Sequence, residues 1–134
     1  MCGIAGFSLK EKSIKKESIL NLMNQKLTHR GPDGEGFFHN DDISMSHKRL
    51  AIIDLNIRSN QPFVDKNNEC VLVFNGEIYN YIELKKILIE DGYKFNTTGD
   101  TEVLLNSYLT FDGIYNLELN NDISYFNNSN LRFE

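Results

Sequence analysis

The chain has 134 residues, the size of one domain, and 40% of them are hydrophobic, which is enough for a buried core. A formal net charge of -5 gives no electrostatic support to a nucleic-acid or anionic-membrane partner, and no apolar run approaches the length of a membrane span. Two cysteines without a CxxC motif favour neither a disulfide framework nor a zinc site, and the N-terminus lacks the shape of a signal peptide, so we expect a cytoplasmic protein.

The first half of the chain predicts one helix among short strands. GIAGFSL, at residues 3–9, favours a strand, and apolar side chains recur at helical spacing in residues 16–28. The glycines and the proline of residues 30–36 predict a loop after this helix. Short apolar pieces between residues 37 and 53 predict antiparallel strands, and a polar loop is expected over residues 56–68.

The second half of the chain predicts two more helices and two strands. A buried strand is expected at residues 71–74, followed by a helix at residues 78–91 that Gly92 ends. A strand at residues 93–97 and a third helix that begins at Asp100 come next, because acidic residues suit the positive end of a helix dipole.

The pattern fades beyond about residue 108. Residues 116–130 contain six asparagines and only scattered apolar positions, although residues 122–126 could form one strand. We therefore divide the chain into a domain at residues 1–108 and a divergent, Asn-rich segment at residues 109–134.

Cys2 is a candidate nucleophile because of its position. Removal of the initiator methionine leaves Cys2 with a free α-amino group, whose pKa in model peptides is about 7.7–8.0. This amine is partly neutral at working pH and can serve as general base for the thiol, directly or through a water, so that nucleophile and base belong to one residue. The alternative is a small buried hydrophobic residue, an interpretation that we favour for Cys70.

Four other positions allow both a structural and a functional interpretation. Asn75-Gly76 is typical of a plain turn, but its amide groups could also point together at a developing oxyanion. Arg49 is either a solvated residue at a strand edge or a bidentate clamp for a carboxylate. Asp100 is either a helix-capping residue or an acceptor for an ammonium group, and Glu77 has the same two interpretations.

Five sequence blocks occur in an order that is specific to one family. MCGIAGF, HRGPDGEG, HKRLAIIDL, FNGEIYNY and TTGDTEVLL follow one another over residues 1 to about 108. Together they resemble the glutaminase domain of class II amidotransferases, and most closely that of asparagine synthetases. The resemblance implies an α+β fold of the N-terminal-nucleophile hydrolase type, which is an αββα sandwich of two antiparallel sheets flanked by helices.

The resemblance also implies hydrolysis of L-glutamine to glutamate and ammonia. Cys2 is then the nucleophile, Asn75 and Gly76 form the oxyanion hole, and Arg49 holds the α-carboxylate of glutamine. The α-amino group and the remaining contacts fall to four further residues, Ile52, Ile53, Glu77 and Asp100. Glutamine hydrolysis needs no metal or cofactor in this family, whereas ATP and magnesium serve a second domain that activates aspartate and receives the ammonia.

The chain departs from the family pattern in two respects. The ATP-binding synthetase domain does not occur in these residues, so we expect a fragment, a truncated product or a subunit that supplies ammonia to a partner. Two strand-forming segments of the family are also not found after residue 108, which predicts a fold that is incomplete at its C-terminus and marginally stable. Two non-enzymatic alternatives therefore remain, a truncated non-catalytic remnant and a glutamine-binding regulatory module.

Overall fold

The computed structural model describes residues 1–9 and 15–110 of the chain. A three-stranded antiparallel sheet in the order β1-β3-β2 contains β1 (Gly3–Ser8), β2 (Gly34–His39) and β3 (Ile43–Arg49). Helix α1 (Lys16–Lys26) packs against β1 and β3. The central strand β3 has four buried side chains, and all of them are polar or charged: Ser44, Ser46, His47 and Arg49.

The register of the first sheet determines which residues meet at its end. Gly3 at the start of β1 lies opposite Lys48, and Gly34 at the start of β2 lies opposite Arg49. An alanine-like Cβ at Gly36 would lie 2.2 Å from the Gln61 carbonyl oxygen, so the segment after β3 runs directly over β2. Cys2, which precedes β1, is therefore brought to the residues that follow β3.

The second sheet is a short hairpin next to two helices. Strands β4 (Phe63–Val64) and β5 (Val71–Leu72) pair antiparallel, and helix α3 (Asp100–Thr110) packs on β4 and on helix α2 (Tyr81–Glu90). Apolar side chains from both helices make the core between them, and the 93–97 segment covers it. This core consists of Leu84, Leu88 and Val103, with Ile78, Tyr81, Tyr93 and Phe95 against it.

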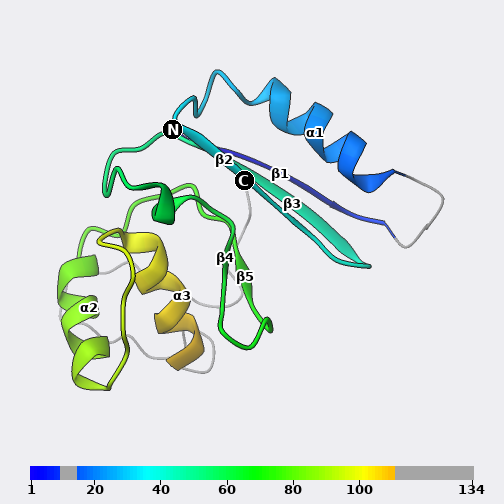
Figure 1. Ribbon diagram of the computed structural model, residues 1–134. Helices are drawn as coiled ribbons and strands as arrows, with labels where there is room; N and C mark the ends of the chain where they lie inside the picture. The colour runs from blue at the N-terminus through cyan, green and yellow to red at the C-terminus, as the bar shows by residue number, and fades with distance from the viewer. Residues whose placement is uncertain (10–14, 111–134) are drawn as a thin grey trace.

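These elements form successive layers of helix, sheet, sheet and helix. Figure 1 shows α1 on the outer side of the first sheet, and α2 and α3 beyond the β4–β5 hairpin on the other side. The α+β fold with two antiparallel sheets and flanking helices, which the sequence predicted, is thus confirmed for the described residues.

Two predicted strands are absent, because other groups take their backbone hydrogen bonds. In residues 93–97, the N–H groups of Asn96 and Thr97 donate to the Glu102 carboxylate, at 3.0 and 2.7 Å, instead of to a neighbouring strand. Residues 51–53 are also not a strand, and the carbonyl of Ile53 accepts a hydrogen bond from Arg49. These predictions were wrong because side chains from elsewhere in the chain act as the partners of these segments.

Several predicted boundaries also move. The loop predicted at 30–36 gives way to β2 at Gly34, and the polar loop at 56–68 contains β4 and a single 3-10 turn, η1 (Ile57–Ser59). The strand predicted at 71–74 ends at Leu72. The end of α2 is as predicted, since Gly92 has a positive φ of 93°, which glycine adopts without strain.

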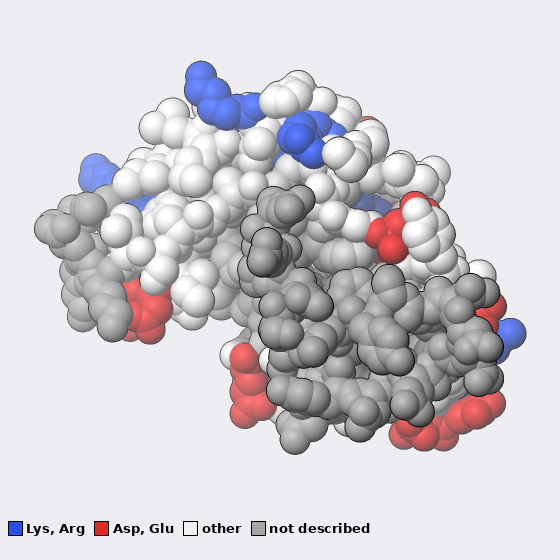
Figure 2. Space-filling view, turned by 180° about the vertical axis from the view of Figure 1, so that it is seen from behind, with Lys and Arg blue, Asp and Glu red and all other residues white. Residues whose placement is uncertain are grey.

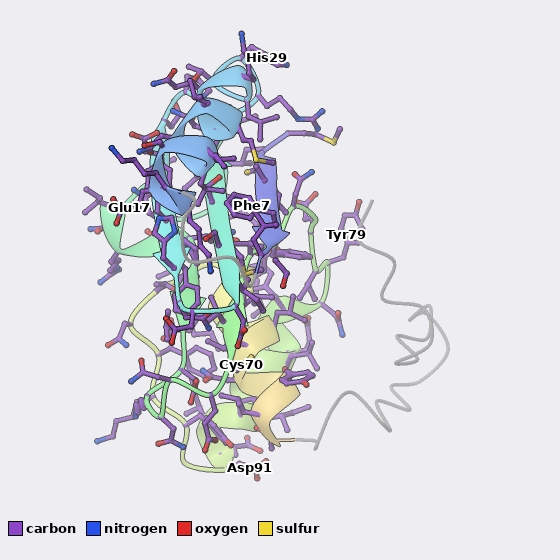
Figure 3. The ribbon with its side chains drawn as sticks, turned by 90° about the vertical axis from the view of Figure 1, so that its right-hand side faces the viewer. Phe7, Glu17, His29, Cys70, Tyr79 and Asp91 are labelled. Atoms are coloured by element: carbon purple, nitrogen blue, oxygen red, sulfur yellow. The ribbon has the colours of Figure 1, made fainter. Side chains whose placement is uncertain are left out.

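The surface is mixed in character. No helix in the described residues is both long and apolar enough to cross a membrane. On the side shown in Figure 2, Lys and Arg side chains lie mainly over the upper part, and Asp and Glu side chains over the lower part. Tyr79 projects away from the ribbon in Figure 3 and is 89% exposed.

The strand expected at residues 122–126 and the proposed boundary after residue 108 depend on residues 111–134, which lie outside the described part of the chain.

Candidate active site

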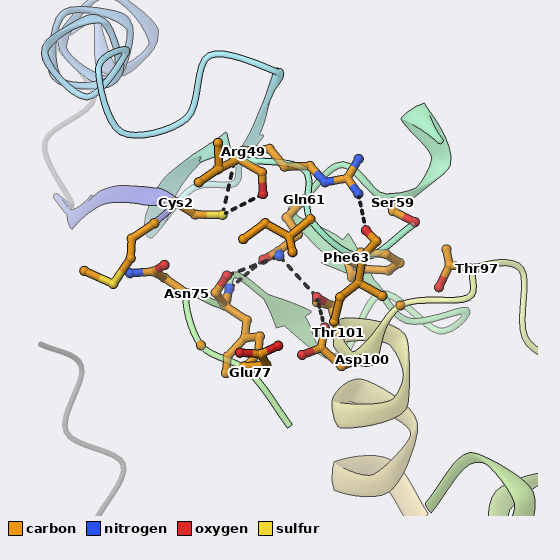
Figure 4. A pocket seen from close by; sticks show the side chains of 17 residues that line it. Cys2, Arg49, Ser59, Gln61, Phe63, Asn75, Glu77, Thr97, Asp100 and Thr101 are labelled. Carbon is orange, nitrogen blue, oxygen red and sulfur yellow. Dashed lines mark hydrogen bonds between the residues drawn. The ribbon is translucent and has the colours of Figure 1, made fainter. Parts of the chain in front are cut away.

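A cavity of about 270 Å³ lies where the end of β3 meets the start of α3 and the segment after β5. Figure 4 shows its lining from close by. All eight residues that the sequence analysis singled out line this one cavity: Cys2, Arg49, Ile52, Ile53, Asn75, Gly76, Glu77 and Asp100. They come from four separate parts of the chain, so only the fold brings them together.

The Cys2 thiol is held against the residue that follows β3. The Leu50 N–H donates to Cys2 Sγ at 3.3 Å, and Sγ lies 3.7 Å from the Leu50 carbonyl oxygen (Figure 4). The backbone of Cys2 is fixed as well, because Arg30 Nε donates to its carbonyl at 3.0 Å. The backbone of Leu50 therefore positions the Cys2 thiol at the wall of the cavity.

Arg49 is buried, with 7% of its surface exposed, so it is not a solvated residue at a strand edge. Its guanidinium donates to Asn56 O at 3.0 Å, to Asn60 Oδ1 at 3.2 Å and to Ile53 O at 3.3 Å, and it also contacts the Asp54 carbonyl. All of these acceptors are neutral, and within the described residues no carboxylate forms an ion pair with Arg49. A buried cation without a counter-ion at a cavity wall is suited to bind an anionic ligand group.

Asn75, Gly76 and Glu77 are exposed at the opposite wall of the cavity. A Cβ at Gly76 would lie 2.6 Å from Cζ of the Phe74 ring, so a larger residue there would require the ring or the backbone to move. The ring of Phe74 thus packs directly on the Gly76 backbone, and the Asn75-Gly76 step is more constrained than a plain exposed turn.

Asp100 is the first residue of α3, and its side chain reaches across to the segment after Glu77. Its Oδ2 accepts the Ile78 N–H at 3.1 Å, and the Thr101 hydroxyl lies 3.5 Å from Oδ1. Asp100 is buried at the cavity wall and has no basic partner in the described residues. The carboxylate therefore keeps capacity to accept hydrogen bonds from a ligand.

Sequence reasoning missed two polar residues at this site, Gln61, which lines the cavity, and His47, which contacts Phe74. The side-chain amide of Gln61 accepts a hydrogen bond from the Phe74 N–H and donates one to the Phe74 carbonyl. His47 Nε2 lies 3.2 Å from the same carbonyl oxygen. Burial lowers the pKa of His47 to about 4, against the raising effect of the Phe74 hydrogen bond, and nearby Arg49 lowers it further. His47 is therefore neutral near pH 7. Gln61 stands in a polar loop outside the five motif blocks, and His47 begins the HKRLAIIDL block but was given no role from the sequence.

Thr97, Gly99 and Thr101 also line the cavity and were not singled out as ligand-binding residues from the sequence. Glu102 fixes the backbone around Thr97, and the Thr98 N–H donates to Asp54 Oδ2 at 2.8 Å. Hydrogen bonds from the Thr98 and Asn56 N–H groups keep the pKa of Asp54 well below its usual range.

The chemistry of the cavity suits a free amino acid. A guanidinium on one side can bind an α-carboxylate, and the Asp100 and Glu77 carboxylates can accept from an α-ammonium group. The thiol of Cys2 and the amide groups of Asn75 and Gly76 line the same space, where a nucleophile and donors to an oxyanion can act on one carbonyl group.

Comparison with known proteins gives consistent results. A family model described as glutamine amidotransferase domain matches residues 1–119. An asparagine synthetase (glutamine-hydrolyzing) of Bacillus subtilis is 43% identical over 111 residues, which are 81% of this chain and 17% of the relative.

Similar relatives occur in an archaeon and a plant. A putative asparagine synthetase (glutamine-hydrolyzing) of Methanocaldococcus jannaschii is 42% identical, over 84% of this chain and 25% of the relative. An asparagine synthetase (glutamine-hydrolyzing) of Arabidopsis thaliana is 36% identical, over 89% of this chain and 21% of the relative. The chain thus spans a quarter or less of the length of these relatives.

Proposed function

Since the chain belongs to the glutamine amidotransferase family, we propose that it hydrolyses the side-chain amide of L-glutamine to glutamate and ammonia, with the Cys2 thiol as nucleophile. The observation that carries this proposal is the single cavity lined by all eight candidate residues. It combines a thiol, a buried guanidinium without a counter-ion and two carboxylates, a set that matches the zwitterionic end and the reacting amide of glutamine.

Substrate binding uses the charged walls of the cavity. Arg49 holds the α-carboxylate, while Asp100 and Glu77 accept from the α-ammonium group. Ile52 and Ile53 contact the substrate from the segment whose carbonyls Arg49 binds. The side-chain amide then extends toward Cys2 and the Asn75-Gly76 segment.

The first chemical step forms a thioester. With Met1 removed, the α-amine of Cys2 accepts the thiol proton, and sulfur attacks the amide carbon of the substrate. The carbonyl electrons move to oxygen, and the resulting oxyanion accepts hydrogen bonds from the Asn75 side chain and the Gly76 N–H. When the intermediate collapses, the C–N bond breaks and the nitrogen takes the proton from the α-ammonium group of Cys2, so ammonia leaves.

The second step restores the enzyme. Water attacks the thioester carbon, and the same amine accepts its proton. The C–S bond then breaks, the resulting α-ammonium group returns the proton to the departing sulfur, and glutamate is released with the Cys2 thiol restored. No group of three His, Cys, Asp or Glu side chains suited to a metal ion occurs in the described residues.

The proposal also includes the molecule that accepts the ammonia and the partner that binds it. Relatives named asparagine synthetase (glutamine-hydrolyzing) support a synthetase domain or subunit as partner. The family resemblance adds the further proposal that ATP and magnesium bind to that partner and that aspartate accepts the ammonia. The present residues supply the ammonia-producing half of that reaction.

Glutamate release from glutamine by the purified protein tests the proposal. Cys2→Ala removes the nucleophile and should abolish release, whereas Cys70→Ser changes the other cysteine, which does not line the cavity, and should retain it. Release by Cys2→Ala at the parent rate would refute the proposal.

Thermal unfolding with glutamine separates the alternatives if no glutamate is released. A ligand that binds only the folded state raises the unfolding midpoint. A raised midpoint without hydrolysis would indicate a glutamine-binding module, and no change in midpoint would indicate a non-catalytic remnant.

A further inference from the structure

We propose that Gln61 is a positioning residue for the oxyanion-binding segment: its side-chain amide fixes the Phe74 peptide and thereby the direction of the Asn75 and Gly76 donors. This inference rests on the proposed glutamine hydrolysis. It assigns a role to a residue that lines the cavity and that no sequence motif singled out.

The amide of Gln61 makes three hydrogen bonds in the interior. Its Oε1 accepts the Phe74 N–H at 2.5 Å, and its Nε2 donates to the Phe74 carbonyl at 3.2 Å and to Thr101 Oγ1 at 3.3 Å. Gln61 is only 6% exposed. Figure 4 shows it between the Asn75 segment and the start of α3. One side chain thus replaces the strand partner that Phe74 lacks, because β5 ends at Leu72.

His47 is a second side chain that binds the Phe74 carbonyl. Its side chain is fully buried, and Nε2 lies 3.2 Å from the Phe74 carbonyl oxygen, which can only accept. Because burial keeps His47 neutral near pH 7, Nε2 carries the single ring proton. The Phe74 carbonyl therefore receives two donors, one from β3 and one from the segment that runs over β2.

The position of Phe74 is transmitted to Gly76 by direct contact. A Cβ at Gly76 would lie 2.6 and 2.7 Å from two atoms of the Phe74 ring, so the ring lies against the Gly76 backbone. A change in the Phe74 peptide would move its ring and the adjoining Asn75-Gly76 step together. An oxyanion is stabilised only by donors at hydrogen-bond distance from its final position, so small displacements are costly for the chemical step.

Two substitutions separate hydrogen bonding from packing. Gln61→Met keeps the length of the side chain and removes all three hydrogen bonds, whereas Gln61→Glu keeps an acceptor for the Phe74 N–H and removes the two donors. For both we expect kcat to fall about tenfold to a hundredfold, the scale of a misplaced oxyanion donor. KM should change little, because Arg49 and Asp100 remain in place.

The pH profile of Gln61→Glu provides a readout that loss of packing would not give. A buried carboxyl has a raised pKa, and its protonated form regains a donor for the Phe74 carbonyl. The variant-to-parent ratio of kcat should therefore rise as pH falls from about 8 to about 5. The ionisable and charged groups around the cluster, His47, Arg49 and Asp100, are present in both proteins, so the ratio reports the change that the introduced carboxyl causes.

Asn24→Leu is the matched control, since Asn24 is another buried amide, located in α1 and hydrogen-bonded to Glu35 at 2.8 Å. It should lower thermal stability and leave kcat unchanged. Alkylation of Cys2 by iodoacetamide, measured with Cys70→Ser present, should proceed at the parent rate in the Gln61 variants, because the thiol is held by Leu50 and not by Gln61.

The experiments distinguish failure of the proposed function from failure of the proposed role of Gln61. If the parent protein releases no glutamate, the proposed function fails. If the parent is active, three results would each overturn the role of Gln61: an unchanged kcat in Gln61→Met, a loss in both variants without recovery of Gln61→Glu at low pH, or failure of both variants to fold, which would make the amide a requirement for folding.

Discussion

The backbone N–H of Ile78 donates a hydrogen bond of 3.1 Å to Oδ2 of Asp100, which joins the segment after Gly76 to the first residue of α3. This contact connects the two walls proposed to bind opposite ends of the substrate. The substitutions below are chosen to separate the contributions of the two walls.

Asp100→Asn should raise KM for glutamine with little loss of fold. The asparagine Oδ1 can still accept the Ile78 N–H, but the charge that attracts the α-ammonium group is lost. A charged hydrogen bond contributes about 1.5–3 kcal/mol, so KM should rise by about tenfold to a hundredfold or somewhat more. Steady-state kinetics measures KM, and an unchanged value would remove Asp100 from the site.

A form of the protein that retains Met1 should not hydrolyse glutamine. Retention replaces the α-amine of Cys2 with an amide, which cannot accept the thiol proton. Mass spectrometry identifies the processed and unprocessed forms, and glutamate release is measured for each. Equal rates in the two forms would contradict the α-amine as base.

Arg49→Ala should reduce both binding and stability. The clamp for the α-carboxylate is lost, and the oxygens of Asn56, Asn60 and Ile53 lose their donor. We expect KM to rise at least about tenfold and the free energy of unfolding to fall by about 1–3 kcal/mol. Arg49→Lys keeps the charge but not the fork geometry, so it should recover part of the binding. Denaturant unfolding measures the free energy of unfolding, and steady-state kinetics measures KM. If neither quantity changes, Arg49 has neither the binding role nor the stabilising role.

Gly76→Ala should lower kcat more than it raises KM. The new Cβ would meet the Phe74 ring at 2.6 Å, so either the ring or the Asn75-Gly76 step must move. Overpacking of this kind costs about 1–3 kcal/mol of stability, and the displaced donors slow the chemical step. Gly92→Ala is a useful comparison, because that site has a positive φ but open space, so it should cost stability without affecting kcat. Equal kcat for Gly76→Ala and the parent would show that this contact does not matter.

The free energy of unfolding should depend on His47 between about pH 6.5 and pH 4. The pKa of this group is lowered from 6.5 to about 4 by burial. The unfolded state therefore binds more protons in this window, and stability falls as pH decreases from 6.5 toward 4. His47→Gln retains a donor for the Phe74 carbonyl without titrating, so its unfolding free energy should decline less over the same range. If the free energy of unfolding declines equally with pH in the variant and the parent, the titration of His47 does not contribute to stability.

Local sequence was sufficient for much of the fold. The helical spacing of residues 16–28 and the acidic start at Asp100 corresponded to α1 and α3, and Gly92 ended α2 with the positive φ that glycine permits. These features depend on neighbours within a few positions in the chain, so they can be recognised from composition and periodicity. The ordered motif blocks likewise indicated the family that the comparisons established.

Only the tertiary structure decided how the cavity is built and supported. Glu102 takes the N–H groups of the 96–97 segment and so prevents the strand expected there, while Gln61 and His47 hold Phe74 from 13 and 27 positions away in the chain. Arg49 became a buried cation because the 53–60 segment folds over it. A buried backbone group must find a partner, but its identity depends on which side chains the fold brings near. Such partners are distant in sequence and leave no local pattern.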